Sequence, residues 1–217
     1  MLFPSLKTVM NISLVAALSL YLNAFTNKPI QKENSTEVTW IDDMKSSLKN
    51  GDLILRLNND PTSQLIKQFN RKDKTYSHAG LLVMENNEPY VYHMISGDES
   101  PDGKMKREKL EDFTNRKNNS AIGIYRYQMN EDEVNKVVKA LLELYESEIT
   151  FDKELDLAST DKLYCAEMVK NIIEGATSNK YQIGTTLPGP LEARVIANHT
   201  KVPLSIMKKR EIVAIES

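Results

Sequence analysis

The chain has 217 residues, a length that fits one domain preceded by a short leader. Hydrophobic residues make up 41% of it, which excludes a disordered chain, and the net charge of −2 gives no basic footprint for a nucleic-acid partner. There is one cysteine, Cys165, so an internal disulfide framework and a multi-cysteine zinc cage are excluded.

The N-terminal segment differs from the rest of the chain. Its apolar run from Ile12 to Phe25 follows a single charge, Lys7, which predicts a signal peptide or an N-terminal membrane anchor over residues 1–26. The alternative is a buried N-terminal helix of the domain. Residues 27–39 form a polar linker, and residues 40–217 are predicted to form one domain. We therefore expect an exported protein, periplasmic or extracellular, with this segment as its possible link to a membrane.

The pattern after the linker predicts an α+β domain with a largely antiparallel sheet. Strands are predicted at residues 52–57, 76–84, 89–95, 122–127, 203–207 and 211–215. Helices are predicted at residues 40–48, 62–70, 130–146, 162–174 and 191–197. Asn130 and Glu133 are expected to form a capping box, and Asp161 is expected to cap the helix at 162–174. The charged segment 97–118 is expected to be a surface excursion with one short helix, lining or covering the site.

Cys165 is the candidate nucleophile. It falls near the start of the helix predicted at 162–174, where unpaired N–H groups and the helix dipole favour a thiolate. A thiolate is the reactive form in covalent catalysis. The alternative is a small buried residue, since Val169 and Ile172 share nearly the same helix face.

His78 and His93 are the candidate base and its orienting partner. They lie on two strands joined at Asn86-Asn87, and a tight hairpin there sets His93 opposite residue 80 and diagonal to His78. The two imidazoles can then touch on one face, as a base and its orienter require, whereas a one-residue slip separates them. The alternative for His78 is a half-buried strand histidine. His199 is expected to be a surface loop residue.

The sequence also contains two candidate aspartates and one candidate set of metal ligands. Asp52 and Asp152 are expected to shape turns or loops rather than act as acids. Cys165, His78 and His93 also form a possible zinc ligand set, but without a closely spaced ligand pair this ranks second. We expect no metal and no organic cofactor.

Three motifs together resemble the permuted papain-like family of the YiiX/YaeF type. They are Gly51-Asp52-Leu53-Ile54, Tyr76-Ser77-His78-Ala79-Gly80 and Tyr164-Cys165-Ala166-Glu167-Met168-Val169. This family is a circularly permuted relative of NlpC-type cell-wall cysteine peptidases and is akin to lecithin:retinol acyltransferases.

The resemblance implies a papain-like α+β fold in which a helix carries the cysteine against a mostly antiparallel sheet. Cys165 is then the nucleophile and His78 the base. His93 takes the third position, where many relatives have Glu. Glu167 and Tyr164 are implied to support the site, with a solvated charge and helix packing as the alternatives.

The expected function is that of a thiol amidase, peptidase or acyl hydrolase acting on an amide or ester. NlpC-type ancestry indicates a cell-wall peptide as substrate, whereas the acyltransferase kinship indicates an acyl lipid, and no residue decides between them. The rival hypothesis is a non-catalytic ligand-binding module on the same fold.

Overall fold

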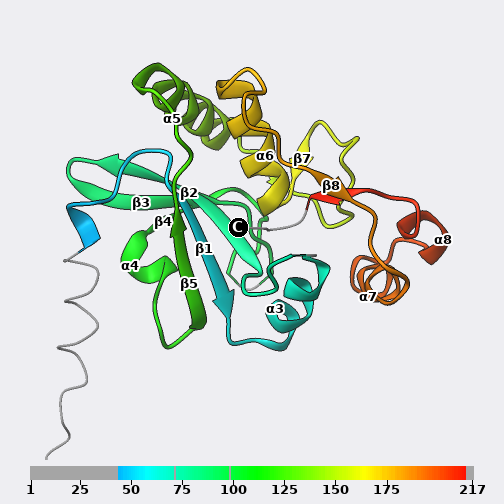
Figure 1. The fold of residues 1–217 in the computed structure, drawn as a ribbon. Helices are drawn as coiled ribbons and strands as arrows, with labels where there is room; N and C mark the ends of the chain where they lie inside the picture. The colour runs from blue at the N-terminus through cyan, green and yellow to red at the C-terminus, as the bar shows by residue number, and fades with distance from the viewer. Residues whose placement is uncertain (1–43, 71, 98, 214–217) are drawn as a thin grey trace, which may run out of the picture. The chain divides into compact units, whose positions relative to one another are not determined.

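The computed structural model describes residues 44–70, 72–97 and 99–213, which belong to one unit of the chain, Ile41–Ser217 (Figure 1). The predicted leader and linker, and the first four residues of the helix predicted at residues 40–48, lie outside the described residues. Within the described part, every helix is too short or too polar to cross a membrane.

A five-stranded antiparallel sheet in the order β4-β3-β2-β1-β5 forms the centre of the described part. Its strands are β1 (Leu53–Asn58), β2 (His78–Glu85), β3 (Glu88–His93), β4 (Lys106–Lys109) and β5 (Asn119–Tyr125). Side chains of β1 alternate between two apolar layers, with Leu53 and Leu55 in one and Ile54 in the other, because successive residues of a strand face opposite sides. The predicted α+β class is confirmed.

The β2–β3 hairpin has the register expected from its turn. Asn86 and Asn87 both take positive φ, 51° and 68°, as a two-residue turn with the twist of the strands requires. Leu81 then pairs with Tyr92. Gly80 lies directly beside the end of β3, where an added Cβ would be 3.1 Å from the His93 Cβ.

Helices cover both faces of the sheet (Figure 1). On the Leu53 face lie α5 (Glu131–Glu146) and α6 (Cys165–Ala176), whereas α4 (Leu110–Phe113) covers the Ile54 face. The predicted helix at 62–70 is present as α3 (Pro61–Ile66) followed by the 3-10 turn η1 (Lys67–Phe69). The capping box of α5 is confirmed, with Asn130 Oδ1 accepting from the Glu133 N–H at 2.9 Å.

The start of α6 corrects one prediction. Residues Lys162–Leu163 form β7, which pairs in parallel with β6 (Thr150–Phe151), so the helix begins three residues later than predicted. Tyr164 is therefore the N-cap residue, and Asp161 is not. Strand pairing fixes Leu163 in an extended conformation, and this makes Cys165 the first residue of the helix.

The segment 97–118 is also more ordered than its charge suggests. It contains β4, which pairs with β3, and α4. Leu110 and Phe113 of α4 are buried at 2% and 0% exposure, so part of this segment belongs to the core rather than to a surface excursion. The spacing of three residues sets both side chains on the same side of a single helical turn.

The C-terminal region forms its own apolar cluster. It consists of α7 (Pro190–Thr200), α8 (Leu204–Met207) and the small sheet of β8 (Thr185–Thr186) with β9 (Ile212–Val213). The strand predicted at 203–207 is wrong, because Pro203 serves as N-cap of a helical turn that buries Met207. His199 is exposed as expected, but it lies in the last turn of α7 and not in a loop.

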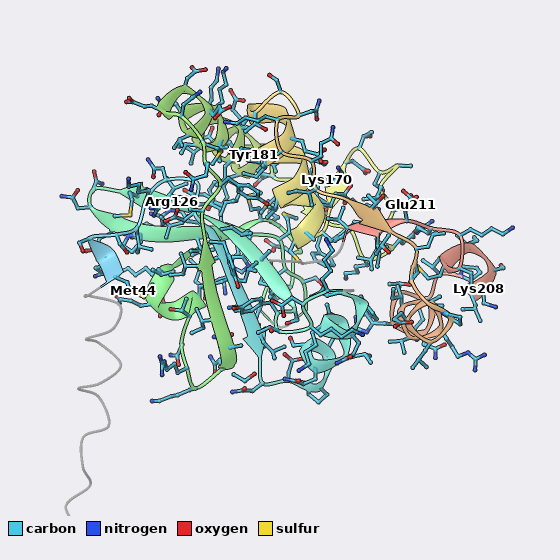
Figure 2. All side chains as sticks on the ribbon, in the orientation of Figure 1. Met44, Arg126, Lys170, Tyr181, Lys208 and Glu211 are labelled. Carbon is cyan, nitrogen blue, oxygen red and sulfur yellow. The ribbon has the colours of Figure 1, made fainter. Side chains whose placement is uncertain are left out.

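Two buried aspartates hold the chain where loops meet the sheet. Asp52 has no exposed surface and accepts from Arg126 Nε at 2.6 Å, Arg126 Nη2 at 2.7 Å and the Lys49 N–H at 2.8 Å. Arg126 is labelled in Figure 2. Asp152 accepts from the backbone N–H groups of Glu154 and Asp156. The expectation that these residues shape turns and loops is confirmed.

Candidate active site

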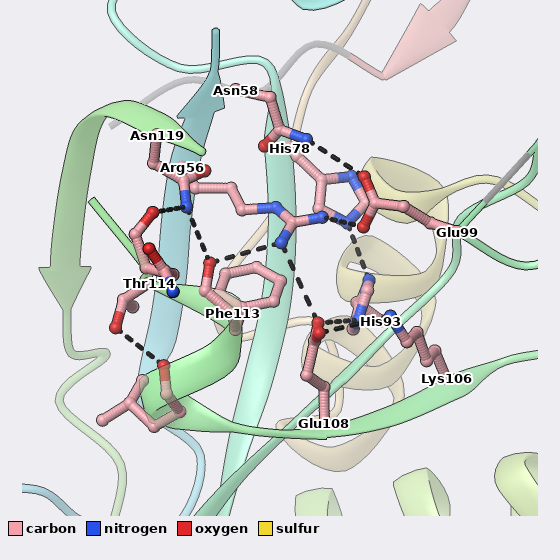
Figure 3. A network of polar contacts seen from close by, with 12 residues as sticks. Arg56, Asn58, His78, His93, Glu99, Lys106, Glu108, Phe113, Thr114 and Asn119 are labelled. Atoms are coloured by element: carbon pink, nitrogen blue, oxygen red, sulfur yellow. Dashed lines mark hydrogen bonds and ion pairs between the residues drawn. The ribbon is translucent and has the colours of Figure 1, made fainter. Parts of the chain in front are cut away.

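His78 and His93 form a direct hydrogen bond (Figure 3). His78 begins β2 and His93 ends β3, and the distance from His78 Nε2 to His93 Nδ1 is 2.8 Å. The rings meet edge to face, with centroids 5.0 Å apart, and both residues are buried, at 8% and 0% exposure. The predicted contact between the two imidazoles is confirmed.

Glu108 extends this pair to a third side chain. Its Oε2 is 3.2 Å from His93 Nε2, and its Oε1 accepts from Lys106 Nζ at 3.2 Å. The sequence gives no local signal for Glu108, because the run Lys106–Lys109 is charged throughout, as is typical of a surface segment. As β4 pairs with β3, Glu108 lies opposite Val91 and diagonal to His93 on the same face.

Arg56 and Phe113 enclose the histidine pair. Arg56 of β1 lies opposite His78 of β2 and is 3% exposed. Its Nη1 donates to the Phe113 carbonyl at 3.2 Å, and its Nη2 donates to Glu99 Oε2 at 3.0 Å. Its guanidinium lies 4.3 Å over the Phe113 ring, whose centroid is 4.9 Å from that of His93. An arginine inside the apolar strand 52–57 was the signal that the sequence analysis left unused.

Cys165 occupies the first position of α6, which packs against β2. The backbone N–H groups of Ala79, Ala166 and Cys165 itself act to lower the pKa of the thiol. Ala79 directly follows His78, so the fold brings the sulfur to the strand segment that carries the candidate base. Helix geometry leaves the first N–H groups of α6 without carbonyl partners inside the helix.

Cys165 is half-buried, and the raised pKa of its thiol favours the uncharged form at neutral pH, contrary to the thiolate expected at a helix start. Burial raises the pKa of Cys165 to about 11, and the three N–H groups and the charge of Arg56 only partly oppose it. Burial, followed by the charge of Arg56, also lowers the pKa of His78 well below its usual range. Loss of hydration therefore outweighs the helix N-terminus, and the resting pair is an uncharged thiol with an uncharged imidazole.

Glu167 and Tyr164 support the start of α6. Glu167 is 2% exposed, and its Oε2 accepts from the Tyr164 N–H at 3.4 Å, so the alternative of a solvated charge is wrong. Burial raises the pKa of Glu167 to about 7. The Tyr164 hydroxyl accepts from the Val213 N–H at 2.6 Å and ties the helix start to β9.

The zinc alternative finds no support in the geometry. Residues 44–70, 72–97 and 99–213 contain no group of three or more His, Cys, Asp and Glu side chains arranged to hold a metal ion. His78 Nε2 and His93 Nδ1 point at each other, so these two nitrogens cannot both direct a lone pair at one ion.

Comparisons with known proteins identify the fold and the family. The crystal structure of metalloprotein YiiX from Escherichia coli O157:H7 is similar in fold, with a TM-score of 0.59 at 20% identity over 76% of this chain and 88% of that chain. No curated protein matches by sequence. A family described as permuted papain-like amidase enzyme, YaeF/YiiX, C92 family, matches residues 47–187. The chain has the permuted papain-like α+β fold and belongs to this amidase family.

Proposed function

We propose that the protein is an exported thiol amidase in which Cys165 is the nucleophile, His78 the general base and His93 the residue that orients His78. Membership of an amidase family supports hydrolysis in general. The observation that carries the specific proposal is the 2.8 Å bond between His78 and His93, since His78 directly precedes Ala79, whose N–H acts to lower the pKa of the Cys165 thiol.

The proposed reaction begins with proton transfer. Because His78 Nε2 is bonded to His93, Nδ1 is the nitrogen that remains to take the thiol proton. The sulfur attacks the substrate carbonyl carbon, and the tetrahedral oxyanion accepts hydrogen bonds from the N–H groups of Cys165 and Ala166. His78 then protonates the leaving amine or alcohol, which leaves a thioester on Cys165. Water, deprotonated by His78, hydrolyses that thioester and restores the thiol.

Because the Cys165 thiol and the His78 imidazole are both uncharged at rest, charge separates between them only during the reaction with substrate. A thiol with a pKa of about 11 does not ionise before substrate arrives, so proton transfer to His78 accompanies the attack on the carbonyl. His78 with a lowered pKa stays unprotonated, and therefore available as a base, below the pH at which an ordinary histidine titrates. Activity should accordingly persist into mildly acidic solution.

The proposed substrate is a cell-wall peptide or an acyl lipid with an amide or ester bond. Kinship with NlpC-type peptidases supports the peptide, and kinship with acyltransferases supports the lipid. The apolar N-terminal segment supports export and a position near the membrane, where either substrate is reached. No nucleic-acid partner is proposed.

Hydrolysis by a small set of variants tests this proposal. The wild type, Cys165→Ala, His78→Ala and the control His199→Ala are assayed on p-nitrophenyl acetate, peptidoglycan peptides and N-acyl lipids. We expect background rates for Cys165→Ala and a loss of about 10²- to 10⁴-fold for His78→Ala, with His199→Ala unchanged. Full activity of Cys165→Ala would contradict the thiol mechanism, and inactivity of the wild type on all three classes would favour the binding module. The substrate class that the wild type prefers separates the peptide from the lipid.

A further inference from the structure

We propose that Glu108 is a positioning residue that fixes which ring nitrogen carries the proton in both His93 and His78. The inference rests on the proposed function for the roles of the two histidines. It starts from one observation, the unbroken line of contacts from Glu108 Oε2 to His93 Nε2 at 3.2 Å and from His93 Nδ1 to His78 Nε2 at 2.8 Å (Figure 3).

Glu108 is held as an anion by cations at both of its oxygens. Lys106 Nζ lies 3.2 Å from Oε1, and Arg56 Nη1 lies 3.9 Å from Oε2. Burial alone would raise the pKa of Glu108, but its interactions with His93 and Lys106 outweigh burial and lower the pKa to about 2. An ionised carboxylate only accepts hydrogen bonds.

Because Glu108 can only accept a hydrogen bond, it also fixes the proton positions in His93 and then in His78. Because Glu108 can only accept, the His93 proton must be on Nε2, and in neutral His93 the other nitrogen, Nδ1, is then a lone-pair acceptor. His78 must therefore donate to it from Nε2. Its Nδ1 is left with a lone pair, which is the state that a base for the Cys165 thiol requires. A single carboxylate at the end of the line thus prepares a nitrogen two imidazoles away.

Glu108→Gln is the most informative substitution because it keeps the shape of the side chain and adds a donor. Lys106 and Arg56 can only donate, but Lys106 Nζ is within hydrogen-bond distance of Oε1 at 3.2 Å whereas Arg56 Nη1 is 3.9 Å from Oε2. Lys106 would therefore hold the new amide oxygen, and the amide NH₂ would face His93 Nε2. His93 would move its proton to Nδ1, and His78 would have to accept at Nε2 and carry its own proton on Nδ1. The base would be blocked with little change in packing.

A second substitution, at Lys106, should rescue the effect of Glu108→Gln. In the double variant Lys106→Met with Glu108→Gln, the amide is free to turn its oxygen toward His93, which restores the original proton positions without restoring the charge. Lys106→Met alone keeps the carboxylate and should keep the wild-type proton positions. Glu85→Gln is the matched control, since Glu85 is another partly buried carboxylate in the same sheet, bonded to Arg107 and Tyr92 and not to a histidine.

The test is long-range ¹H–¹⁵N NMR of the imidazoles at about pH 7.5, where neutral rings report the protonated nitrogen directly. His199, exposed on α7, is the internal reference. We expect protons on Nε2 of both His78 and His93 in the wild type and in Glu85→Gln. In Glu108→Gln we expect both protons on Nδ1, and in the double variant a return to Nε2.

Rates of Cys165 acylation accompany the spectra. Glu108→Gln should acylate about 10- to 100-fold more slowly than the wild type, and the double variant should recover most of that loss. A wild-type spectrum with either proton on Nδ1 would overturn the inference even if no variant folds, and so would unchanged proton positions in folded Glu108→Gln. Because the spectra need no substrate, a failure here is distinct from a failure of the thiol mechanism, which Cys165→Ala alone decides.

Discussion

The reactivity of Cys165 toward iodoacetamide should rise steeply through alkaline pH. Alkylation follows the thiolate fraction, and a pKa of about 11 gives a fraction of about 10⁻⁴ at pH 7 and about 10⁻² at pH 9. The rate should therefore increase about 100-fold between these two values, and about 25-fold more by about pH 10.5. A free cysteine with a pKa of about 8.5 gains about 25-fold over the first interval and almost nothing over the second.

The assay is intact-mass measurement of alkylation across this pH range, with circular dichroism recorded at each pH. Cys165 is the single cysteine of the chain, so one mass increment reports one site. His78→Ala should leave the profile nearly unchanged, because the resting thiol has not given its proton to His78. A rate that levels off near neutral pH in the wild type, and falls there in His78→Ala, would contradict the uncharged resting thiol and indicate a preformed thiolate–imidazolium pair.

Three further predictions concern the framework of the site. Asp52→Asn removes the buried negative charge that faces the Arg126 guanidinium, so the free energy of unfolding measured in urea should fall by about 2–4 kcal/mol. Asp132→Asn, at an exposed ion pair, should change it by less than about 0.5 kcal/mol. Equal effects of the two substitutions would contradict this prediction. Gly80→Ala places a Cβ 2.5 Å from the Val91 Cγ1 and should therefore move β3. The free energy of unfolding should fall by about 1–3 kcal/mol, and the rate of Cys165 acylation should fall as well. An unaltered acylation rate would show that the site does not depend on the spacing between β2 and β3. Asn130→Ala removes the side-chain cap of α5 and should lower the free energy of unfolding by about 1 kcal/mol without changing the rate of Cys165 acylation. A slower acylation would contradict this prediction.

Features set by local chemistry could be predicted from the sequence. The Asn86-Asn87 turn fixes the hairpin register, and with it the contact between His78 and His93. The capping box of α5 is likewise a local pattern, since Asn130 and Glu133 are three residues apart and need no distant partner. The motif around Cys165 indicated a helix that carries the cysteine, although its first residue was misplaced by three positions.

Features set by distant partners could not be predicted. The start of α6 depends on the pairing of Leu163 with Phe151, which overrides the capping propensity of Asp161. Glu108 belongs to the site only because a short charged strand pairs with β3, and no local pattern shows that pairing. The neutral thiol is a tertiary effect as well, since burial under the assembled sheet and helix outweighs the N-terminal position of Cys165 in α6.

Covalent trapping of the acyl-enzyme tests whether Cys165 is the nucleophile and His78 its base. The protein is mixed with p-nitrophenyl acetate, quenched in acid within the first turnover and digested, and the peptide that contains Cys165 is analysed by mass spectrometry. We expect one acetyl group on Cys165 in the wild type, formed at least about 100-fold more slowly in His78→Ala. An acetyl group on another residue, or equal rates of Cys165 acetylation in the wild type and His78→Ala, would contradict these roles.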